Sequence, residues 1–360
     1  MQELINIVEP TLKDETGHCM SFVNSLISTT SNIQFQIWAD RNCKTENITS
    51  SAIVKKYFSK TFRKFQCLLL YRKLLSTPNK TFIATASRLD LMIFDLVARY
   101  QVPGNKIYFY FHWMNADPKK KDSLRILAKR QPGFVIIAPT QSVARVFQEA
   151  GFNNVKLAPY PTQNILHKSK NSKKFTHAWY AGAARTDKGF GRVVDLIGLV
   201  QKQHLDIPFV VQASPDHHGK YDIDIVGDIA RLKDYAYPHV KICDETLSSE
   251  QYQSYFEGSV CIQAYSAKDF ADRVSGVTLD ALLAGCPIIS GPGTWTANQV
   301  IRFNAGVILE DTSPEAMLAA LVQVINKYDF YCTNAMLASE MIRKEHEASH
   351  LANAILCENS

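Results

Sequence analysis

The chain has 360 residues, 46% of them hydrophobic and 21% charged, which is the composition of a soluble globular protein long enough for two domains. It contains no run of 18 uncharged apolar residues and no basic N-terminal stretch followed by an apolar one, so we expect neither a membrane-spanning helix nor a signal peptide. The eight cysteines form no CxxC pair and several lie in apolar stretches, which favours reduced thiols in a cytosolic protein over disulfides or a zinc site.

The first half of the chain alternates short apolar strands with helical stretches. Strands separated by helices predict an α/β protein with a parallel sheet covered on both faces. The predicted strands are 4–8, 35–39, 82–86, 106–111, 134–138 and 155–158, and the predicted helices include 19–27, 90–100 and 143–150.

The net charge of +6 is concentrated in this half, because no acidic residue occurs from Asn47 to Leu89. If the segment 51–75 is one helix, its basic side chains share one face and its aromatic side chains the other. Such a helix is typical of a protein that lies on an anionic membrane surface. The alternative is an ordinary surface helix with its aromatic residues in the core, and nucleic-acid binding is not expected because no recognised module accompanies the charge. The basic residues are Lys55, Lys56, Lys60, Arg63 and Lys64.

Two positions in the first half are candidates for ligand contact. Gly17 follows the first strand and precedes the first helix, where the missing Cβ lets the backbone approach a ligand. His112 ends the aromatic strand at 106–111 and so lies at the carboxyl edge of the sheet. Its imidazole could hydrogen-bond a hydroxyl, and we assign it positioning more than acid–base chemistry. The alternative for His112 is a capping or core histidine.

A second alternation follows the polar stretch 167–174, which is the best linker in the sequence. It predicts a second parallel sheet, and ligands of such sheets bind beyond the carboxyl ends of the strands. The predicted strands are 178–181, 209–213, 240–242, 260–264, 287–290 and 306–309, with helices at 190–203, 249–256, 278–284, 314–328 and 333–356.

Two cations three residues apart lie in the loop after the strand at 178–181. The Arg185 guanidinium could bind a diphosphate through two parallel hydrogen bonds, and Lys188 could bind it as a point charge. The alternative is that both charges are only solvated on a loop.

His217 and His218 are adjacent, a pattern that raises the question of a metal site. Adjacent side chains point apart on an extended chain, and no cysteine or third histidine lies at ligand spacing. We therefore expect a polar loop here, with no metal and no cofactor.

The most informative segment is 272–289, which reads as a loop, a helix, a glycine stop and an apolar strand. The unpaired N–H groups at the start of a helix suit a phosphate oxygen. Asp272 precedes the helix and Asp280 lies inside it, and carboxylates in these places suit hydroxyl groups on either side of the phosphate. The alternative is a buried strand–helix–strand connection without a ligand, in which one acid is solvated on the loop and the other is a charge on the helix face. The residues at the start of the helix are Ser275, Gly276, Val277 and Thr278.

This segment resembles the donor-site signature of retaining glycosyltransferases with the two-domain GT-B fold, in particular the large family numbered four. In that signature two glutamates are separated by seven positions, and the second is followed by alanine, a small helix, glycine, any residue and proline. Asp272 and Asp280 replace both glutamates here, while Ala281, Gly285 and Pro287 stand where the signature has them.

Other segments also resemble this family. The spacing from Gly182 to Lys188 matches its Gly-Arg…Lys-Gly loop, although Arg185 stands three residues after the glycine instead of next to it. The resemblance implies that both cations neutralise the leaving diphosphate and that Gly17 contacts the donor. It also implies that His112 lies beside the transferred sugar, that Asp272 binds sugar hydroxyls and that Asp280 binds the ribose.

The resemblance implies two Rossmann-like domains that face each other across a cleft. Residues 1–166 would form the acceptor domain and 175–330 the donor domain, and the helix of 331–360 would cross back to the first domain. The implied activity is metal-independent transfer of a sugar from a nucleotide-diphosphate sugar to a carbohydrate or lipid-linked acceptor, in polysaccharide, lipopolysaccharide or glycolipid synthesis.

Such an enzyme would be cytoplasmic, and the basic segment raises the question of peripheral contact with the inner face of the membrane. Two other classes of function remain open from the sequence. One is a nucleotide-sugar epimerase on the same fold, and the other is a protein that binds a nucleotide sugar without catalysis.

Overall fold

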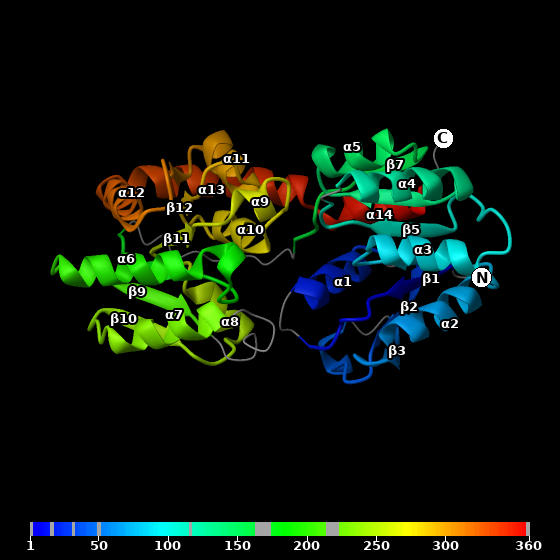
Figure 1. The fold of residues 1–360 in the computed structure, drawn as a ribbon, viewed down its shortest axis with the longest axis horizontal. Helices are drawn as coiled ribbons and strands as arrows, with labels where there is room; N and C mark the ends of the chain where they lie inside the picture. Colours follow the sequence, from blue (N-terminus) through cyan, green and yellow to red (C-terminus); the bar gives the residue numbers. More distant parts are fainter. Residues whose placement is uncertain are drawn as a thin grey trace. The chain divides into compact units, whose positions relative to one another are not determined.

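The computed structural model divides the chain into two compact units, which we describe separately (Figure 1). The first unit comprises Met1–Asn164 and Glu345–Ser360, and the second comprises Ile165–Lys344. The structure describes residues 3–14, 18–30, 33–48, 52–114, 117–162, 174–213 and 223–357.

The first unit contains a parallel sheet of seven strands in the order β3-β2-β1-β4-β5-β6-β7. The inner strands β5 and β6 are buried along their whole length, as expected for a sheet that is covered on both faces. The strands are β1 (Glu3–Val8), β2 (Ile33–Asp40), β3 (Ala52–Phe58), β4 (Lys80–Ile83), β5 (Ile107–Tyr110), β6 (Val135–Ala138) and β7 (Asn154–Leu157).

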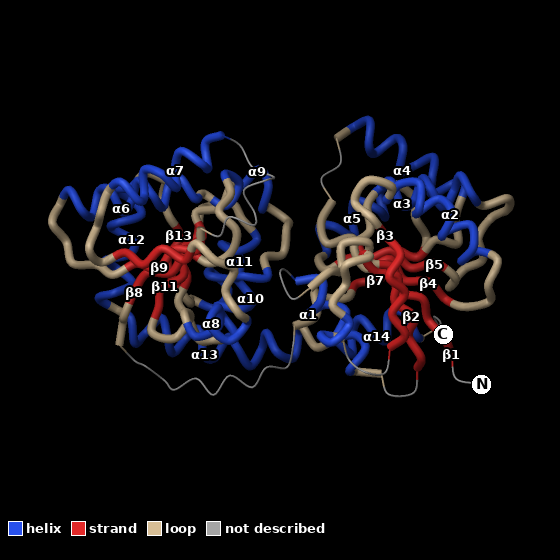
Figure 2. Tube along the Cα trace, turned by 90° about the horizontal axis from the view of Figure 1, so that it is seen from below, coloured by secondary structure: helices blue, strands red, loops and turns tan. Residues whose placement is uncertain are grey.

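Helices cover both faces of this sheet. The helices α2, α3, α4 and α5 contribute to one hydrophobic core, whereas α1 packs with α14 on the other side (Figure 2). Their bounds are α1 (His18–Ser28), α2 (Arg63–Leu75), α3 (Arg88–Val97), α4 (Pro118–Arg130), α5 (Gln141–Glu149) and α14 (Ala348–Leu356), with a short 3-10 helix, η1, at Thr45–Asn47.

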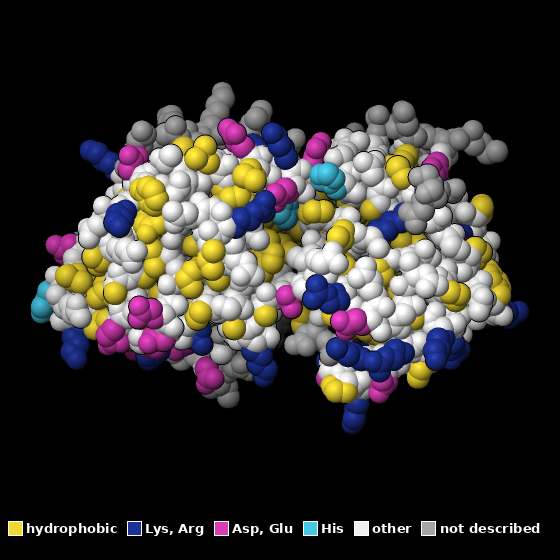
Figure 3. Space-filling view, turned by 90° about the horizontal axis from the view of Figure 1, so that it is seen from above, with side chains coloured by type: hydrophobic (Ala, Val, Ile, Leu, Met, Phe, Trp, Pro, Cys, Tyr) yellow, Lys and Arg dark blue, Asp and Glu magenta, His cyan; other side chains and the backbone are white. Residues whose placement is uncertain are grey.

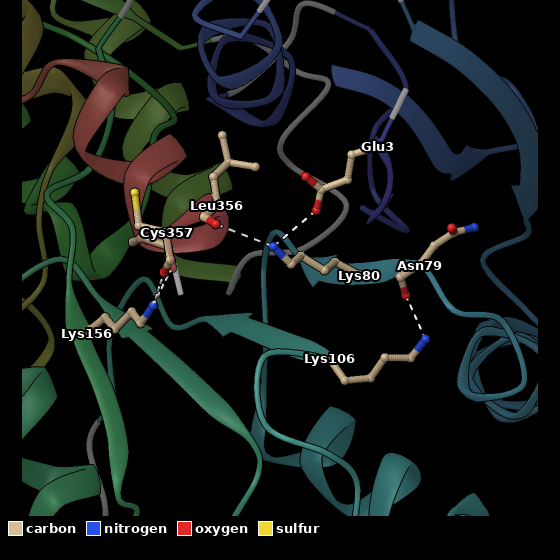
Figure 4. Close-up of polar contacts among 8 residues, drawn as sticks. Glu3, Asn79, Lys80, Lys106, Lys156, Leu356 and Cys357 are labelled. Carbon is tan, nitrogen blue, oxygen red and sulfur yellow. Dashed lines mark hydrogen bonds and ion pairs between the residues drawn. The ribbon is translucent and has the colours of Figure 1, made fainter. Parts of the chain in front are cut away.

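The last turn of α14 is held to the first unit by two lysines (Figure 4). Lys80 Nζ donates to the Leu356 carbonyl at 3.4 Å, and Lys156 Nζ donates to the carbonyls of Ala354 at 3.0 Å and Cys357 at 3.1 Å. The last carbonyls of a helix lack intrahelical partners and carry partial negative charge, so cations stabilise this end. The C-terminal helix therefore belongs to the unit in which the chain begins, as the fold class predicted.

The segment 333–356, expected to be a single helix, forms two. Helix α13 (Tyr328–Glu345) ends before His346, whose carbonyl accepts a hydrogen bond from Thr162 N at 3.0 Å. The His346 ring also contacts the Tyr160 carbonyl through Nδ1 at 2.6 Å. These contacts with the first unit replace the helical hydrogen bonds at the break.

The second unit contains a parallel sheet of six strands in the order β10-β9-β8-β11-β12-β13. Its core lies between the sheet and the helices α6, α7, α12 and α13. The strands are β8 (His177–Tyr180), β9 (Phe209–Gln212), β10 (Val240–Cys243), β11 (Ser259–Gln263), β12 (Ile288–Ser290) and β13 (Gly306–Ile308), and the helices besides α13 are η2 (Thr186–Lys188), α6 (Phe190–Lys202), α7 (Ile223–Asp234), α8 (Ser249–Ser254), α9 (Ala267–Phe270), α10 (Gly276–Leu283), α11 (Trp295–Phe303) and α12 (Pro314–Asn326).

Each sheet has a switch point, where successive strands begin to be added on the opposite side of the first strand. In the first sheet β2 and β3 lie on one side of β1 and β4 lies on the other; in the second, β9 and β10 lie on one side of β8 and β11 lies on the other. Open parallel sheets bind ligands beyond the carboxyl ends of the strands at this point. The loops after β1 and β4, and those after β8 and β11, are therefore the places where a ligand is expected.

The segment 51–75, which was considered as one helix, does not form a single helix. Ala52–Phe58 forms the edge strand β3, which pairs with β2 from Ala52 to Phe58, and α2 begins only at Arg63. This segment is rich in β-branched and aromatic residues, which suit a pleated strand, and pairing with β2 satisfies its backbone groups. The basic residues are thus divided among the strand (Lys55, Lys56), the turn (Lys60) and the start of the helix (Arg63, Lys64).

Within the described ranges, none of the helices combines the length and the apolar character needed to cross a bilayer.

Candidate functional site

The loop after β8 and the start of α10 meet at the switch point of the second sheet. Gly182 follows β8 with φ +92°, and a Cβ added there would lie 2.8 Å from Lys188 Nζ and 3.3 Å from Val277 Cγ2. The missing side chain therefore leaves the space in which the Lys188 ammonium lies near the first turn of α10. A left-handed φ is also strained for other residues.

A second glycine fixes the same loop. Gly189 has φ +71°, and a Cβ on it would lie 2.2 Å from the Ala264 carbonyl oxygen, so only glycine fits here. Beside it Ser266 N donates to the Asp187 carbonyl at 2.9 Å, and Arg192 Nη1 donates to the Ala264 carbonyl at 2.9 Å. The loop after β8 is thus fastened to the segment after β11.

One carboxylate lies between two guanidinium groups in this loop. Arg185 Nε donates to Asp187 Oδ1 at 2.7 Å and Nη2 donates to Oδ2, while Arg273 Nη1 lies 3.8 Å from the same Oδ2. The Arg273 guanidinium also lies 4.9 Å from the centre of the Phe270 ring. Because Lys188 belongs to the same cluster, three cations surround a single acid. Sequence reasoning missed Arg273, although it follows Asp272 directly.

The surroundings of Lys188 change its acidity. Burial lowers the pKa of its ammonium to about 8, the Arg185 charge acts in the same direction, and Asp187 opposes it. The Lys188 ammonium also lies 5.9 Å from the centre of the Tyr265 ring. The charged form of an ammonium that is partly desolvated and lies near other cations is destabilised, so the binding of an anion beside it is favourable.

The start of α10 is held by buried hydroxyl groups. Ser275 caps the helix by accepting a hydrogen bond from Thr278 N at 3.3 Å. Thr278 Oγ1 donates to Gln263 Oε1 at 2.6 Å and lies 2.8 Å from Thr296 Oγ1. The Thr278 amide is therefore occupied by the cap, and Gly276 and Val277 are the predicted residues whose N–H groups precede the first intrahelical bonds.

The two predicted carboxylates lie in different surroundings. Asp272 is exposed on the loop before α10. Asp280 is half-buried and accepts a hydrogen bond from Tyr252 Oη at 3.0 Å. Burial raises the pKa of Asp280 to about 6, and the Tyr252 hydrogen bond and the Lys188 charge limit that rise. Sequence reasoning did not find Tyr252, which comes from α8.

In the first unit, His112 lies just beyond β5 at the carboxyl edge of its sheet. Its Nε2 is 2.9 Å from the Ala84 carbonyl oxygen and 3.4 Å from Thr85 Oγ1. The ring packs against Phe22 and Tyr160 at centroid distances of 5.3 and 5.5 Å. Since a carbonyl only accepts hydrogen bonds, Nε2 carries the ring hydrogen in the neutral form.

Three of the predicted positions cannot be examined in this way. Gly17, His217 and His218 lie outside the described residues. Among the residues that are described, no three His, Cys, Asp or Glu side chains are grouped as metal ligands would be.

Sequence comparison gives no assignment, because no protein-family model and no curated protein matches the chain. Solved structures are similar in fold. HepE from Anabaena in complex with UDP-glucose has a TM-score of 0.70 at 14% identity over 98% of both chains. Sucrose-phosphate synthase from Thermosynechococcus elongatus has a TM-score of 0.68 at 10% identity over 97% of this chain and 96% of that one. WaaG, a glycosyltransferase involved in lipopolysaccharide biosynthesis, has a TM-score of 0.66 at 8% identity over 98% of this chain and all of that one.

The chain has the GT-B fold. At identities this low the similarity establishes the architecture alone, so function must be argued from the residues. In this GT-B chain the residues in question are the cations after β8 and the residues at the start of α10.

Substitution of Asp187 by Asn should destabilise the second unit by about 2 kcal/mol, because Arg185, Arg273 and Lys188 would then face one another without the acid. Urea unfolding at low salt measures this effect, and added pyrophosphate should restore part of the loss. Asp206→Asn is the matched control, since that carboxylate is 89% exposed. Equal effects of the two substitutions would contradict the role given to Asp187.

Proposed function

We propose that the chain is a retaining glycosyltransferase that moves a sugar from a nucleotide-diphosphate sugar to a hydroxyl acceptor in the synthesis of a polysaccharide, lipopolysaccharide or glycolipid. The observation that carries the proposal is the position of the Lys188 ammonium, near the first turn of α10 and in one cluster with two guanidinium groups. The UDP-glucose bound by HepE and the activity of WaaG support this choice.

The diphosphate of the donor would bind to Lys188, Arg185 and the amides of Ser275, Gly276 and Val277. Arg185 would then exchange its contact with Asp187 for one with a phosphate oxygen, while Arg273 continues to balance the Asp187 charge. As the sugar departs, negative charge grows on the diphosphate, and fixed positive groups stabilise it without reorganisation. Neutralisation by these side chains and amides requires no metal.

The remaining site residues would bind hydroxyl groups. Asp280, held by Tyr252, would accept hydrogen bonds from the ribose, and the exposed Asp272 would accept them from the sugar. In the first unit, which would bind the acceptor, His112 would hydrogen-bond a sugar hydroxyl. Gly17 would allow close approach of the backbone to the donor.

We expect Lys188→Ala to abolish transfer and to weaken binding of a nucleoside diphosphate by roughly 10- to 100-fold, the loss of one charge-assisted hydrogen bond. Calorimetric titration with UDP measures the affinity. Lys202→Ala, which removes an exposed lysine at the end of α6, serves as the control. Unchanged turnover in Lys188→Ala with an unchanged melting curve would remove the diphosphate assignment.

The affinity for UDP should fall about fivefold between pH 8 and pH 9, because Lys188, with a pKa of about 8, loses its charge in that range. The diphosphate of the ligand contributes nothing there, since phosphate groups with a second pKa of about 6 are already ionised. Lys188→Arg should bind UDP equally well at both pH values because a guanidinium stays charged. The same slope in Lys188→Arg would assign the titration to another group.

The acceptor would be lipid-linked, and the first unit would dock peripherally on the anionic inner face of a membrane through the corner between β3 and α2. No ion pair joins the cations of this corner to an acid among the described residues, and Phe62 and Phe65 beside them are 63% and 61% exposed. By contrast, several cations of α4, which lie along one edge of the first unit in Figure 3, are paired with acids. The cations of the corner are Lys55, Lys56, Lys60, Arg63 and Lys64.

Vesicle flotation tests this contact. Reversal of Lys55, Lys56, Lys60 and Lys64 to Glu should abolish flotation with anionic vesicles at low salt, since each lysine near such a surface contributes about 1 kcal/mol. The matched control reverses four cations of α4 and should float like the wild type. Equal flotation of both variants and the wild type would show that the corner does not bind membranes. The control reverses Lys119, Lys121, Arg125 and Lys129.

A further inference from the structure

Two buried glutamines end the strands on either side of β8, and the proposed function uses neither of them. Parallel strands that are covered on both faces are normally apolar along their whole length. Here β9 reads Phe-Val-Val-Gln and β11 reads Ser-Val-Cys-Ile-Gln, and both strands lie next to β8. Gln212 is 8% exposed and Gln263 is 1% exposed. A buried polar side chain without hydrogen bonds destabilises a protein, so both amides need partners.

Both glutamine side chains point away from the large core of the second unit. Successive side chains of a strand point to opposite faces of the sheet, and the residue before each glutamine belongs to that core. Gln212 and Gln263 therefore lie on the other face, where Thr278 of α10 contacts Gln263. The core residues of the two strands are Phe209, Val211, Val260 and Ile262.

Gln212 holds the loop that carries Lys188. The pairing of β8 with β9 ends at Tyr180, so the ladder supplies no acceptor for the N–H group of Gly182. This group donates instead to Gln212 Oε1 at 2.7 Å. Gly182 is the residue whose missing side chain leaves room for Lys188 Nζ. Gln212 therefore fixes the backbone beside which the ammonium lies.

Gln263 holds the start of α10 in a similar way. Its Oε1 accepts hydrogen bonds from Thr278 Oγ1 at 2.6 Å and from Thr296 Oγ1 at 3.2 Å, and its Nε2 donates to Cys261 Sγ at 3.4 Å. Thr278 lies in the first turn of α10. The two glutamines thus hold the two halves of the proposed phosphate site, each through its amide oxygen.

A carboxylate at either position would accept the same hydrogen bonds, and hydrogen bonds to a charged acceptor are stronger. It would also place a negative charge beside groups that have to attract an anion. Three cations around Asp187 give the site excess positive charge, and a second carboxylate would cancel part of it. Charges in a partly desolvated site are weakly screened, so the carboxylate would repel a diphosphate. A neutral amide holds the same donors without this repulsion.

We propose that Gln212 and Gln263 are positioning residues of the donor site, neutral acceptors that hold the loop of Lys188 and the start of α10 without opposing the negative charge of the diphosphate. The identity of the anion rests on the proposed function, whereas the hydrogen bonds are contacts within the second unit.

Substitution of Gln212 by Glu and by Met separates charge from hydrogen bonding. Gln212→Glu should weaken the binding of UDP by roughly 10- to 100-fold, because the carboxylate repels the diphosphate. Gln212→Met is neutral and similar in shape, and it should weaken binding only about threefold through the loss of one hydrogen bond. Calorimetric titration measures both affinities. A residue with a merely structural role would give the opposite order, since only the carboxylate still accepts from Gly182.

The stability of the ligand-free protein should follow that opposite order. Gln212→Met should melt at a lower temperature than Gln212→Glu, because methionine leaves the N–H group of Gly182 without its acceptor. Gln203→Glu, which makes the same change at an exposed residue beyond the end of α6, is the control and should bind UDP like the wild type.

Gln263→Glu tests the other half of the site. It should also weaken UDP binding relative to the wild type, and by more at pH 8 than at pH 6. Burial raises the pKa of a carboxyl group, and only its ionised form repels the ligand.

The proposal is overturned if Gln212→Glu and Gln263→Glu both bind UDP as tightly as Gln203→Glu does, or if Gln212→Glu melts as low as Gln212→Met. A wild-type chain that binds UDP but transfers no sugar to any acceptor would instead overturn the proposed function. The titrations and melting curves need no transfer assay, so the two failures can be told apart.

Discussion

The candidate site depends on the close approach of the Lys188 ammonium to Gly182, which has no side chain. Gly182 follows the central strand β8 with a φ of +92°, and a Cβ on it would lie only 2.8 Å from Lys188 Nζ. Because Val277 borders the same space, the ammonium lies near the first turn of α10. Any larger residue at position 182 would displace the charge from the end of the helix. The remainder of the site serves to hold this charge in place.

Several polar and charged groups lie buried around the Lys188 ammonium. Burial and the charges of Arg185 and Arg273 lower the pKa of Lys188, and the single acid Asp187 opposes this only in part. Three cations around one acid leave the site with excess positive charge. Buried hydroxyls of Thr278 and Thr296 fix the start of α10 through Gln263. Such an arrangement costs stability unless an anion arrives, and groups held in this way lose little further freedom when they bind one.

The two parallel sheets and the loop of Lys188 could be predicted from the sequence. The other features depend on contacts between distant residues, which no local sequence pattern contains. The apolar strands predicted the parallel sheets, and the glycine-to-lysine spacing identified the loop of Lys188. The edge strand β3 was considered only as part of a helix, because closely spaced lysines and aromatics fit both periods, and pairing with β2 decides between them. Tyr252 and Arg273 could not be assigned because their partners, Asp280 and Asp187, lie far away in the sequence.

The most direct measurement is a crystal structure of the chain with a bound nucleoside diphosphate. We predict that both phosphates lie between the Lys188 ammonium and the N–H groups of Gly276 and Val277, with Arg185 turned from Asp187 toward a phosphate oxygen. A nucleotide whose phosphates lie elsewhere, with Arg185 still paired to Asp187, would contradict it.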